Sequence, residues 1–352
     1  MTATAAATSA RPAGVALSRR ICFAIAIAAA AIVFSGIRII YIGGLSDFAP
    51  VWYGAHALLQ GIDPYRTFGP GRFQRYDWHL YYPVPAMLAA VPFGLLSEPV
   101  ASLLFSALGG GLLAFAVTRE NWDRAWILFS ASFITAIQSS QWSPIMAAAF
   151  LTPALGFVLI CKPSLGSAIA VSTSSRKSLM VFLIGGAALT ALSFVVLPGW
   201  VGEWVQSVKT GTELNPPITR GPGFLIALAI LRWRQPEARL LLAVACVPQT
   251  SSWYETLLPM LAARSKREMQ FLVACSGAGF LFQILMLDRK AEIATTDIGI
   301  LMVVFVYLPA LIVVLRRPNE GAMPAWIDVL RRGPRSEHSR GNQDQKPSTI
   351  RD

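Results

Sequence analysis

The chain has 352 residues, a formal net charge of +11, 54% hydrophobic residues and only 14% charged ones. Soluble domains carry about 25% charged residues, so this composition excludes an ordinary soluble domain. Apolar runs of about 20 residues recur, the length that an α-helix needs to cross a hydrocarbon core of about 30 Å. The alternating strands of about 10 residues that build a membrane β-barrel do not occur in the pattern. We therefore expect an all-α polytopic membrane protein.

The hydrophobic pattern predicts about ten crossings between residues 19 and 317. The first, at 21–42, follows Arg19-Arg20 and is longer than the apolar core of a usual signal peptide, so we expect it to be retained. The apolar piece at 84–96 is too short to cross. The other crossings are expected at 99–118, 125–140, 144–161, 178–197, 269–287 and 298–315, with less regular ones between 221 and 263. The tails are expected at 1–18, which we predict to be disordered, and at 318–352, which is polar and basic.

Basic residues are distributed unevenly along this pattern. If the N-terminus is cytoplasmic, most of the 30 Lys and Arg residues fall in cytoplasmic segments, including Lys162 and the cluster 264–268. The positive-inside rule then places both termini in the cytoplasm and the loops 43–85 and 198–222 outside a cytoplasmic membrane. Anionic lipids of the inner leaflet account for the net charge, so no nucleic-acid partner is expected.

The loop from Ser46 to Pro85 holds more ionisable chemistry than any other part of the chain. Its acids, bases and cations are Asp47, His56, Asp63, Arg66, Arg72, Arg75, Asp77 and His79. Such a set at one bilayer face indicates a protein that acts on something there. The four cysteines lie in or beside apolar runs without zinc spacing, and the outer carboxylates are scattered. We therefore expect neither a metal nor a cofactor.

The start of this loop has the signals of a short helix lying on the membrane surface. Ser46 is a candidate cap, Asp47 suits a helix N-terminus, and Gly61 ends the helix. One face carries four side chains at spacings typical of an interfacial amphipathic helix: Phe48, Trp52, His56 and Leu59. Asp47 is therefore either a capping residue or a chemical group. Asp63, which precedes Pro64, is more typical of a turn.

Four short motifs follow one another in this loop: Asp47-Phe48, Trp52-Tyr53, Asp63-Pro64-Tyr65 and Tyr82-Pro83. Their succession resembles the first loop of glycosyltransferase family 87, whose members are GT-C-fold membrane enzymes related to polyprenyl-phosphomannose-dependent mannosyltransferases. Weaker likenesses lie downstream, at Gln138 to Pro144, at Lys162-Pro163-Ser164 and at Pro248 to Trp253. The resemblance implies a GT-C-like helical bundle with its short interfacial helix in this first outer loop.

The resemblance also implies an activity, the transfer of a mannose-like sugar from a polyprenyl-phosphate donor to a lipid or glycan acceptor at the outer membrane face. In this reaction Asp47 is the general base that takes the proton of the acceptor hydroxyl. The leaving phosphate needs nearby positive charge, for which the outer loops offer Arg72, Arg75, His79, Lys209 and Arg220. The residues expected to position the acceptor or the loops are Trp52, Tyr53, Tyr65, Tyr82, Trp253 and Glu255.

Two other readings stay open. A transporter or flippase of lipid-linked glycans would place ionisable residues inside its crossings and show repeated, broken helices. Glu255, close to Pro248, favours that class, whereas the nearly uncharged crossings and the lack of a repeat do not. An inactive member of the family is the third reading. It rests on Tyr254-Glu255, which stand where the family has a histidine, and on Lys-Pro-Ser in place of Lys-Pro-Gln.

Overall fold

The computed structural model describes residues 14–41, 43, 46–72, 79–211, 214–289 and 295–331. These residues form helices and connecting loops, with no strand among them and one isolated bridge between Asn215 and Gln249. The all-α prediction is therefore confirmed for the described part of the chain. Most of the two expected tails, together with Arg75 and Asp77, lies outside the described residues.

The described helices alternate between long apolar rods and short, tighter segments. The α-helices are α1 (Leu17–Tyr41), α2 (Ala49–Leu59), α3 (Pro64–Thr67), α4 (Val84–Ala89), α5 (Val91–Gly94), α6 (Glu98–Val117), α7 (Ala131–Gln138), α8 (Ser143–Leu151), α9 (Pro163–Ser172), α10 (Arg176–Val196), α11 (Trp200–Lys209), α12 (Pro236–Cys246), α13 (Lys266–Arg289), α14 (Thr295–Met302), α15 (Leu308–Leu315) and α16 (Ala325–Arg331). The tighter 3₁₀ segments are η1 (Asp123–Phe129), η2 (Pro153–Cys161), η3 (Pro217–Thr219), η4 (Gly221–Arg232), η5 (Trp253–Leu257) and η6 (Pro259–Ala262). η7 (Val303–Tyr307) is a short π-helix between α14 and α15.

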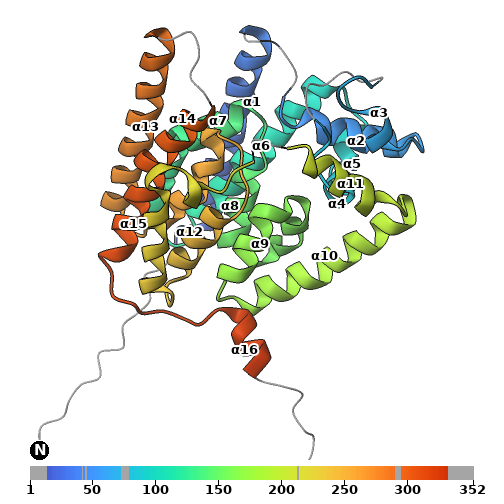
Figure 1. Cartoon of the computed structure of the whole chain (residues 1–352). Coiled ribbons are helices and arrows are strands. Elements are labelled where there is room, and N and C mark those ends of the chain that lie inside the picture. The colour runs from blue at the N-terminus through green and yellow to red at the C-terminus, as the bar shows by residue number, and fades with distance from the viewer. Residues whose placement is uncertain are drawn as a thin grey trace, which may run out of the picture.

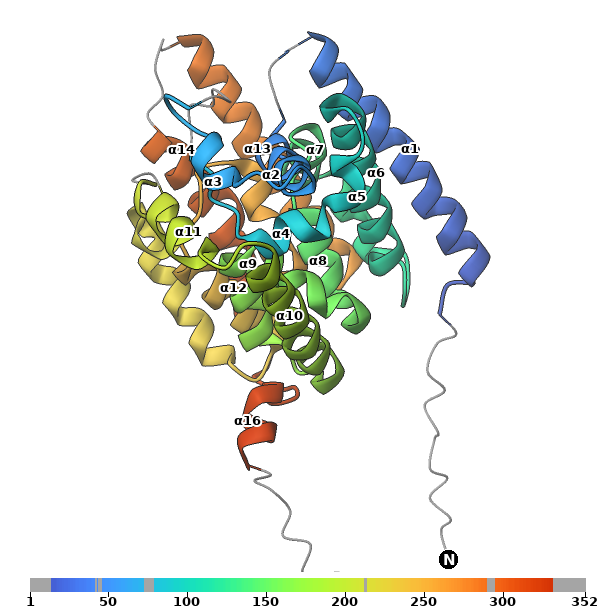
Figure 2. The same ribbon diagram turned by 90° about the vertical axis from the view of Figure 1, so that its right-hand side faces the viewer.

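Among the described residues, five helices are long and apolar enough to cross a membrane. They span Leu17–Tyr41, Glu98–Val117, Arg176–Val196, Lys266–Met286 and Asp297–Leu315, close to five of the expected crossings. α1 packs along α6, and its Arg20 donates a 2.8 Å hydrogen bond to the carbonyl of Phe115 near the end of α6 (Figures 1 and 2). This set of helices fits a multi-pass membrane protein.

The prediction of one continuous crossing at 144–161 is wrong. Pro153 disfavours helical backbone at the residue before it, and Thr152 is extended there, so α8 ends at Leu151. η2 then runs back toward the start of α8. Leu151, at the end of α8, lines one cavity with Thr173, whereas Lys162, which follows η2, lines another cavity with Gln141, just before α8. The charge pattern predicts Lys162 on the face opposite the first loop, and this too is wrong, because Lys162 lies beside Tyr81 and Tyr82 of that loop.

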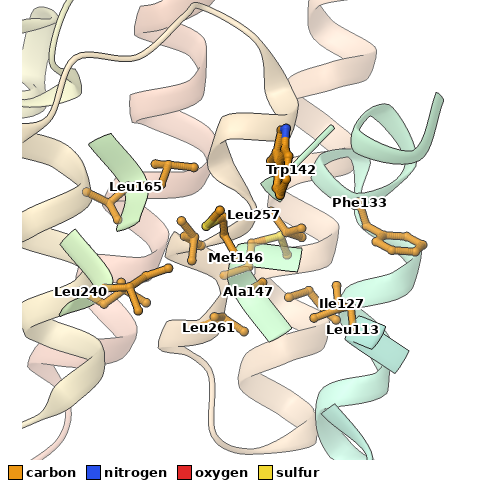
Figure 3. Close-up of a cluster of buried hydrophobic side chains, with 14 of the residues drawn as sticks. Leu113, Ile127, Phe133, Trp142, Met146, Ala147, Leu165, Leu240, Leu257 and Leu261 are labelled. Atoms are coloured by element: carbon orange, nitrogen blue, oxygen red, sulfur yellow. The ribbon is translucent and has the colours of Figure 1, made fainter. Parts of the chain in front are cut away.

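α8 lies at the centre of the core. Seven consecutive positions from Ser143 to Ala149 are buried, as expected for a helix surrounded by protein on every side. Figure 3 shows Met146 and Ala147 of α8 between Leu165 and Leu240 on one side and Leu113 and Ile127 on the other. Because α8 is held on all sides, the turn that precedes it has a fixed position at the end of the bundle.

The two ends of the molecule differ. The short helices α2–α5 lie together with α11 in the upper right part of Figure 1, on the side that faces the viewer in Figure 2. α16 lies at the bottom of both views. α16 begins within the predicted tail but is docked, because the Ala325 amide donates to the Thr173 carbonyl at 2.9 Å and the Trp326 indole donates to the Val171 carbonyl at 3.1 Å. The site described below lies toward the end that holds α2 and α11.

Candidate functional site

A group of buried hydroxyls fixes the first loop to α6. The Ser46 hydroxyl lies 2.6 Å from that of Ser102 and donates to Glu98 at 2.9 Å. It therefore does not cap α2, whose N-cap position is Phe48 and which has no side-chain cap. Phe48 itself is fully buried and stacks on Phe105 at a centroid distance of 4.0 Å. The start of α2 is thus held against the N-terminal half of α6.

The end of α7 is a Schellman turn that aims Gln141. The Gln141 amide donates to the Ala136 carbonyl at 2.9 Å, and the Ser140 amide donates to the Ile137 carbonyl at 3.2 Å, which is the pairing of that motif. Ser140 has a φ of +54°, a left-handed conformation more usual for glycine. The Ser106 hydroxyl donates to the Ser140 hydroxyl at 2.9 Å and helps to hold this conformation.

Asp47 meets this turn through both its backbone and its side chain. Its amide donates to the Ser139 carbonyl at 3.1 Å, and its Oδ2 accepts a 2.7 Å hydrogen bond from Gln141 Nε2. The capping reading of Asp47 does not fit, since Phe48 is the N-cap residue of α2. Asp63, by contrast, accepts from the Tyr65 amide at 3.0 Å and caps α3, as its turn prediction requires.

A second polar pair lies nearby. Lys162 Nζ donates to Glu255 Oε1 at 2.8 Å, and the two side chains are only 14% and 4% exposed. The ammonium also lies 5.9 Å from the centroid of the Tyr254 ring. In this apolar setting each charge depends on the other, because an unpaired buried charge is strongly unfavourable.

Gln141 of the first pair and both members of the second pair line one cavity of about 320 Å³. Its walls come from the first loop, the turn before α8, the start of α9, α11, the segment before η5 and η5 itself. They include Tyr81, Tyr82, Gln141, Lys162, Ser164, Trp204, Thr250, Tyr254 and Glu255. Asp47 does not itself line this cavity, but it adjoins the wall through its hydrogen bond to Gln141. We call this space the Gln141 cavity.

Two of the expected phosphate ligands lie in a different space. Arg72 and His79 line a cavity of about 240 Å³ together with Arg66, Tyr65 and Glu203. We call it the Arg72 cavity. Burial raises the pKa of Glu203 despite the Arg66 guanidinium, whose Nε lies 3.1 Å from the carboxylate.

α11 separates the two cavities. Trp204 faces the Gln141 cavity and donates to the Tyr81 carbonyl at 2.9 Å, while Glu203 faces the Arg72 cavity. The Tyr65 hydroxyl donates to the Tyr82 carbonyl at 2.8 Å and completes the wall. Lys209 is exposed at the end of α11. The expected cations therefore do not gather around Asp47, and Arg75 lies outside the described residues.

Arg220 has a structural position. It is 7% exposed and donates to the Ser251 hydroxyl at 2.6 Å, to the Asn215 carbonyl at 2.8 Å and to the Gln249 carbonyl at 2.9 Å. These bonds fasten the second predicted outer loop to the segment before η5. The expectation that Arg220 holds a phosphate does not fit this position, because its guanidinium is buried and already paired.

The residues expected to position the acceptor or the loops lie at several depths. Tyr82 and Glu255 line the Gln141 cavity, and Tyr65 supports Tyr82 from behind. Trp253 is buried, and its indole donates to Gln283 on α13, away from the cavity. Its role is to fix η5 so that the next two residues face the cavity.

Trp52 and Tyr53 hold the first loop together. The Trp52 indole donates to the Leu96 carbonyl at 2.9 Å, and its ring stacks on His56 at a centroid distance of 5.4 Å. Tyr53 packs on Phe68 at 5.3 Å. Both side chains are partly buried by these contacts. Their positions indicate support of α2 rather than contact with a substrate in the Gln141 cavity.

Sequence reasoning missed Lys162 and Gln141 as site residues. The run 144–161 has the length of a crossing, which places Lys162 on the face opposite the first loop. Pro153, within that run, is the signal that indicates that the chain turns back there. Among the described residues, no group of three or more His, Cys, Asp or Glu side chains could hold a metal ion. Cys161, the neighbour of Lys162, is fully buried.

The described part of the chain is thus all-helical, with five long apolar helices, one buried Lys162–Glu255 pair in the wall of the Gln141 cavity and a partly buried Asp47–Gln141 pair that adjoins it. No protein-family model, no curated protein and no solved structure matches the chain.

Proposed function

We propose that this protein is a membrane glycosyltransferase of the GT-C type. It transfers a mannose-like sugar from a polyprenyl-phosphate donor to a lipid or glycan acceptor at the outer face of the cytoplasmic membrane. The observation that carries the proposal is that the four segments resembling the family meet at one cavity. The first loop, the turn at Gln141, Lys162-Pro163-Ser164 and the segment from Pro248 are far apart in sequence, yet all of them border or adjoin the Gln141 cavity.

Asp47 is the general base in this proposal. As the acceptor oxygen attacks C1 of the sugar, its proton passes to the Asp47 carboxylate, and the C1–oxygen bond to the phosphate breaks with its electron pair. The polyprenyl phosphate leaves with the added negative charge. A general base contributes typically 10²–10⁴-fold to rate. Gln141 is a positioning residue, because its 2.7 Å hydrogen bond holds one carboxylate oxygen and leaves the other for the acceptor.

Lys162 is the cation of this cavity that suits the leaving phosphate. Its ammonium has three protons, of which one is directed to Glu255 at 2.8 Å. A preorganised charge near the developing anion lowers the barrier. We assign Arg72 and His79, with Arg66, to an anionic lipid headgroup in the Arg72 cavity, on the other side of α11.

The finer topology belongs to the same proposal. The five long helices and the shorter segments together form a bundle of about ten crossings, with α2 at the membrane interface. Arg119, Arg124 and Arg264 border one cavity at the end opposite to α2, which supports a cytoplasmic face there. Cysteines placed at exposed Gln60 and Glu120 test this. An impermeant maleimide added to intact cells should label only the first, and labelling of only the second would reverse the orientation.

The second candidate is a transporter or flippase of lipid-linked glycans. It is favoured by the buried Lys162–Glu255 pair and by the broken path of α8, η2 and α9, since transporters use intramembrane ionisable pairs and discontinuous helices.

One experiment separates the candidates. The purified protein is reconstituted in vesicles that contain polyprenyl-phosphate sugars labelled in the sugar, with membrane glycolipids as acceptors. We expect label in a new glycolipid when donor and acceptor are on the same leaflet. Movement of intact donor across the bilayer without any transfer would favour the flippase. Neither transfer nor movement would indicate an inactive family member.

A further inference from the structure

We propose that Gln141 Oε1 and Glu255 Oε2 are the acceptors that recognise hydroxyl groups of the sugar in the Gln141 cavity. The inference rests on the proposed function and extends it. It assigns the polar recognition of the sugar to Gln141, which the sequence did not indicate as a site residue, and to Glu255, which was expected only to position the acceptor or the loops.

The orientation of the Gln141 amide is set by its neighbour. The Nε2 group faces the Asp47 carboxylate at 2.7 Å, and a reversed amide would point its oxygen at another oxygen that also only accepts. Oε1 therefore points away from Asp47. Gln141 is only 5% exposed, and this Oε1 has no hydrogen-bond partner among the described residues. A buried acceptor without a donor is a rare and unfavourable state, which a ligand hydroxyl would relieve.

Glu255, which also lines the cavity, presents the same feature. Its Oε1 accepts from Lys162 at 2.8 Å and from the Thr250 hydroxyl at 3.4 Å. Its Oε2 is buried and has no partner in the described part of the chain, although the residue is only 3% exposed. One oxygen is thus used to hold the fold, and the other is left for a donor.

The chemistry of these two atoms selects the ligand. Both are acceptors, so the group that satisfies them must donate hydrogen bonds. A phosphate offers acceptors only, so it suits the Lys162 ammonium and cannot satisfy these two oxygens, and a polyprenyl chain offers no polar atom. A sugar ring carries several hydroxyl donors at fixed angles. The cavity of about 320 Å³ falls in the range of small-molecule sites, and aromatic walls from Tyr81, Tyr82 and Trp204 surround the few polar groups.

The test compares sugar recognition hydroxyl by hydroxyl. The probes are a soluble short-chain prenyl-phosphate hexose, its single deoxy analogues and the same prenyl phosphate without sugar, each titrated into purified protein in nanodiscs. The variants are Gln141→Met and Glu255→Gln. The control is Gln235→Met, because Gln235 is 1% exposed and also has an unpartnered Oε1 but does not line this cavity.

We expect wild type to prefer the full sugar over two of the deoxy analogues by about 10-fold, the loss typical of one buried hydrogen bond. Gln141→Met should abolish the preference at one hydroxyl position and Glu255→Gln should reduce it at another, as in a double-mutant cycle. Affinity for the sugar-free prenyl phosphate should stay unchanged in Gln141→Met, and the control should behave as wild type.

Two other outcomes overturn the inference in different ways. If wild type transfers sugar and both folded variants keep every hydroxyl preference, the acceptors are merely hydrated and only this inference fails. If wild type neither transfers sugar nor binds the sugar-bearing probe more tightly than the sugar-free one, the proposed function fails with it. Should Glu255→Gln prove unstable, the deoxy series on wild type and Gln141→Met still decides the matter.

Discussion

Gln141 and Asp47 are 94 residues apart in sequence and are joined by a 2.7 Å hydrogen bond between amide and carboxylate. The amide comes from a turn packed into the core, whereas the carboxylate comes from a loop. Because the turn is rigid and the loop is anchored to it, Asp47 has one orientation in the folded protein. A base held in this manner is ready for proton transfer without rearrangement.

The Ser140 conformation should tolerate glycine better than any branched residue. Ser140→Gly should leave stability within about 1 kcal/mol, because relief of the left-handed strain offsets the lost hydroxyl bonds. Ser140→Val should cost about 1–3 kcal/mol, since β-branched residues are strained at positive φ. Thermal unfolding in detergent measures both. A more stable valine variant would show that the turn is not left-handed.

The Lys162–Glu255 pair should be separable into a structural and a chemical part. Lys162→Met leaves a buried carboxylate without its partner and should lower stability by about 3–5 kcal/mol. The double variant Lys162→Met/Glu255→Gln should regain most of that stability, because no charge is left unpaired, yet should remain unable to transfer sugar. If the double variant recovers both stability and transfer, Lys162 has no role at the leaving phosphate.

Glu237 should give the protein an acid-sensitive stability. Burial alone would raise the pKa of Glu237, but the hydrogen bond and charge of Arg264, whose Nη2 lies 2.5 Å away, and the charge of Arg124 outweigh burial and lower it. A carboxyl with a lowered folded-state pKa contributes stability above its unfolded value of 4.5, and this contribution is lost as pH falls below it.

The measurement is thermal unfolding of wild type and Glu237→Gln between neutral pH and pH 3. The variant should be less stable by about 3–5 kcal/mol at neutral pH and should lose less stability on acidification than wild type. Glu120→Gln, at an exposed position, is the control and should follow wild type. Parallel curves for wild type and Glu237→Gln would show that the carboxylate is not paired.

Arg72 and Arg220 should have opposite effects when changed. Arg72 is exposed at its cavity, so Arg72→Ala should weaken binding to vesicles that carry an anionic phospholipid by about 10-fold and leave unfolding unchanged. Arg220→Ala should lower stability, because three hydrogen bonds are lost, without a selective loss of phosphate binding in the protein that still folds. Vesicle binding and thermal unfolding distinguish the two. The reverse pattern would assign the phosphate to Arg220.

Features that depend on nearby residues could be predicted from the sequence. Runs of apolar residues located the five long helices, Gly61, with a φ of +70°, follows the end of α2, and Asp63 caps α3. Each of these depends on hydrophobic length or on the conformational preference of one residue. These local signals left Asp47 as either a capping residue or a chemical group, and its role as a candidate base came from the resemblance of its loop to a known family.

Features that depend on the path of the chain could not be predicted from the sequence. Whether a run of 18 apolar positions crosses or returns depends on one proline, and this decides on which side Lys162 lies. The pairing of Lys162 with Glu255, 93 residues away, is set by packing around α8 and leaves no periodic trace. Arg220 and Arg72 are both arginines in predicted outer loops, so the sequence does not distinguish them. Only the burial of Arg220 shows that it holds loops together.

The most direct test of the account is sugar transfer by Asp47→Asn. Labelled polyprenyl-phosphate sugar is incubated with membranes or vesicles that hold wild type, Asp47→Asn or Asp63→Asn, and transfer to glycolipid is followed with time. We predict that Asp47→Asn is slower than wild type by about 10²–10⁴-fold, with unchanged unfolding and donor binding, because asparagine keeps the shape and cannot take the proton. Asp63→Asn should stay within a few-fold. Near-normal transfer by a folded Asp47→Asn protein would contradict the account.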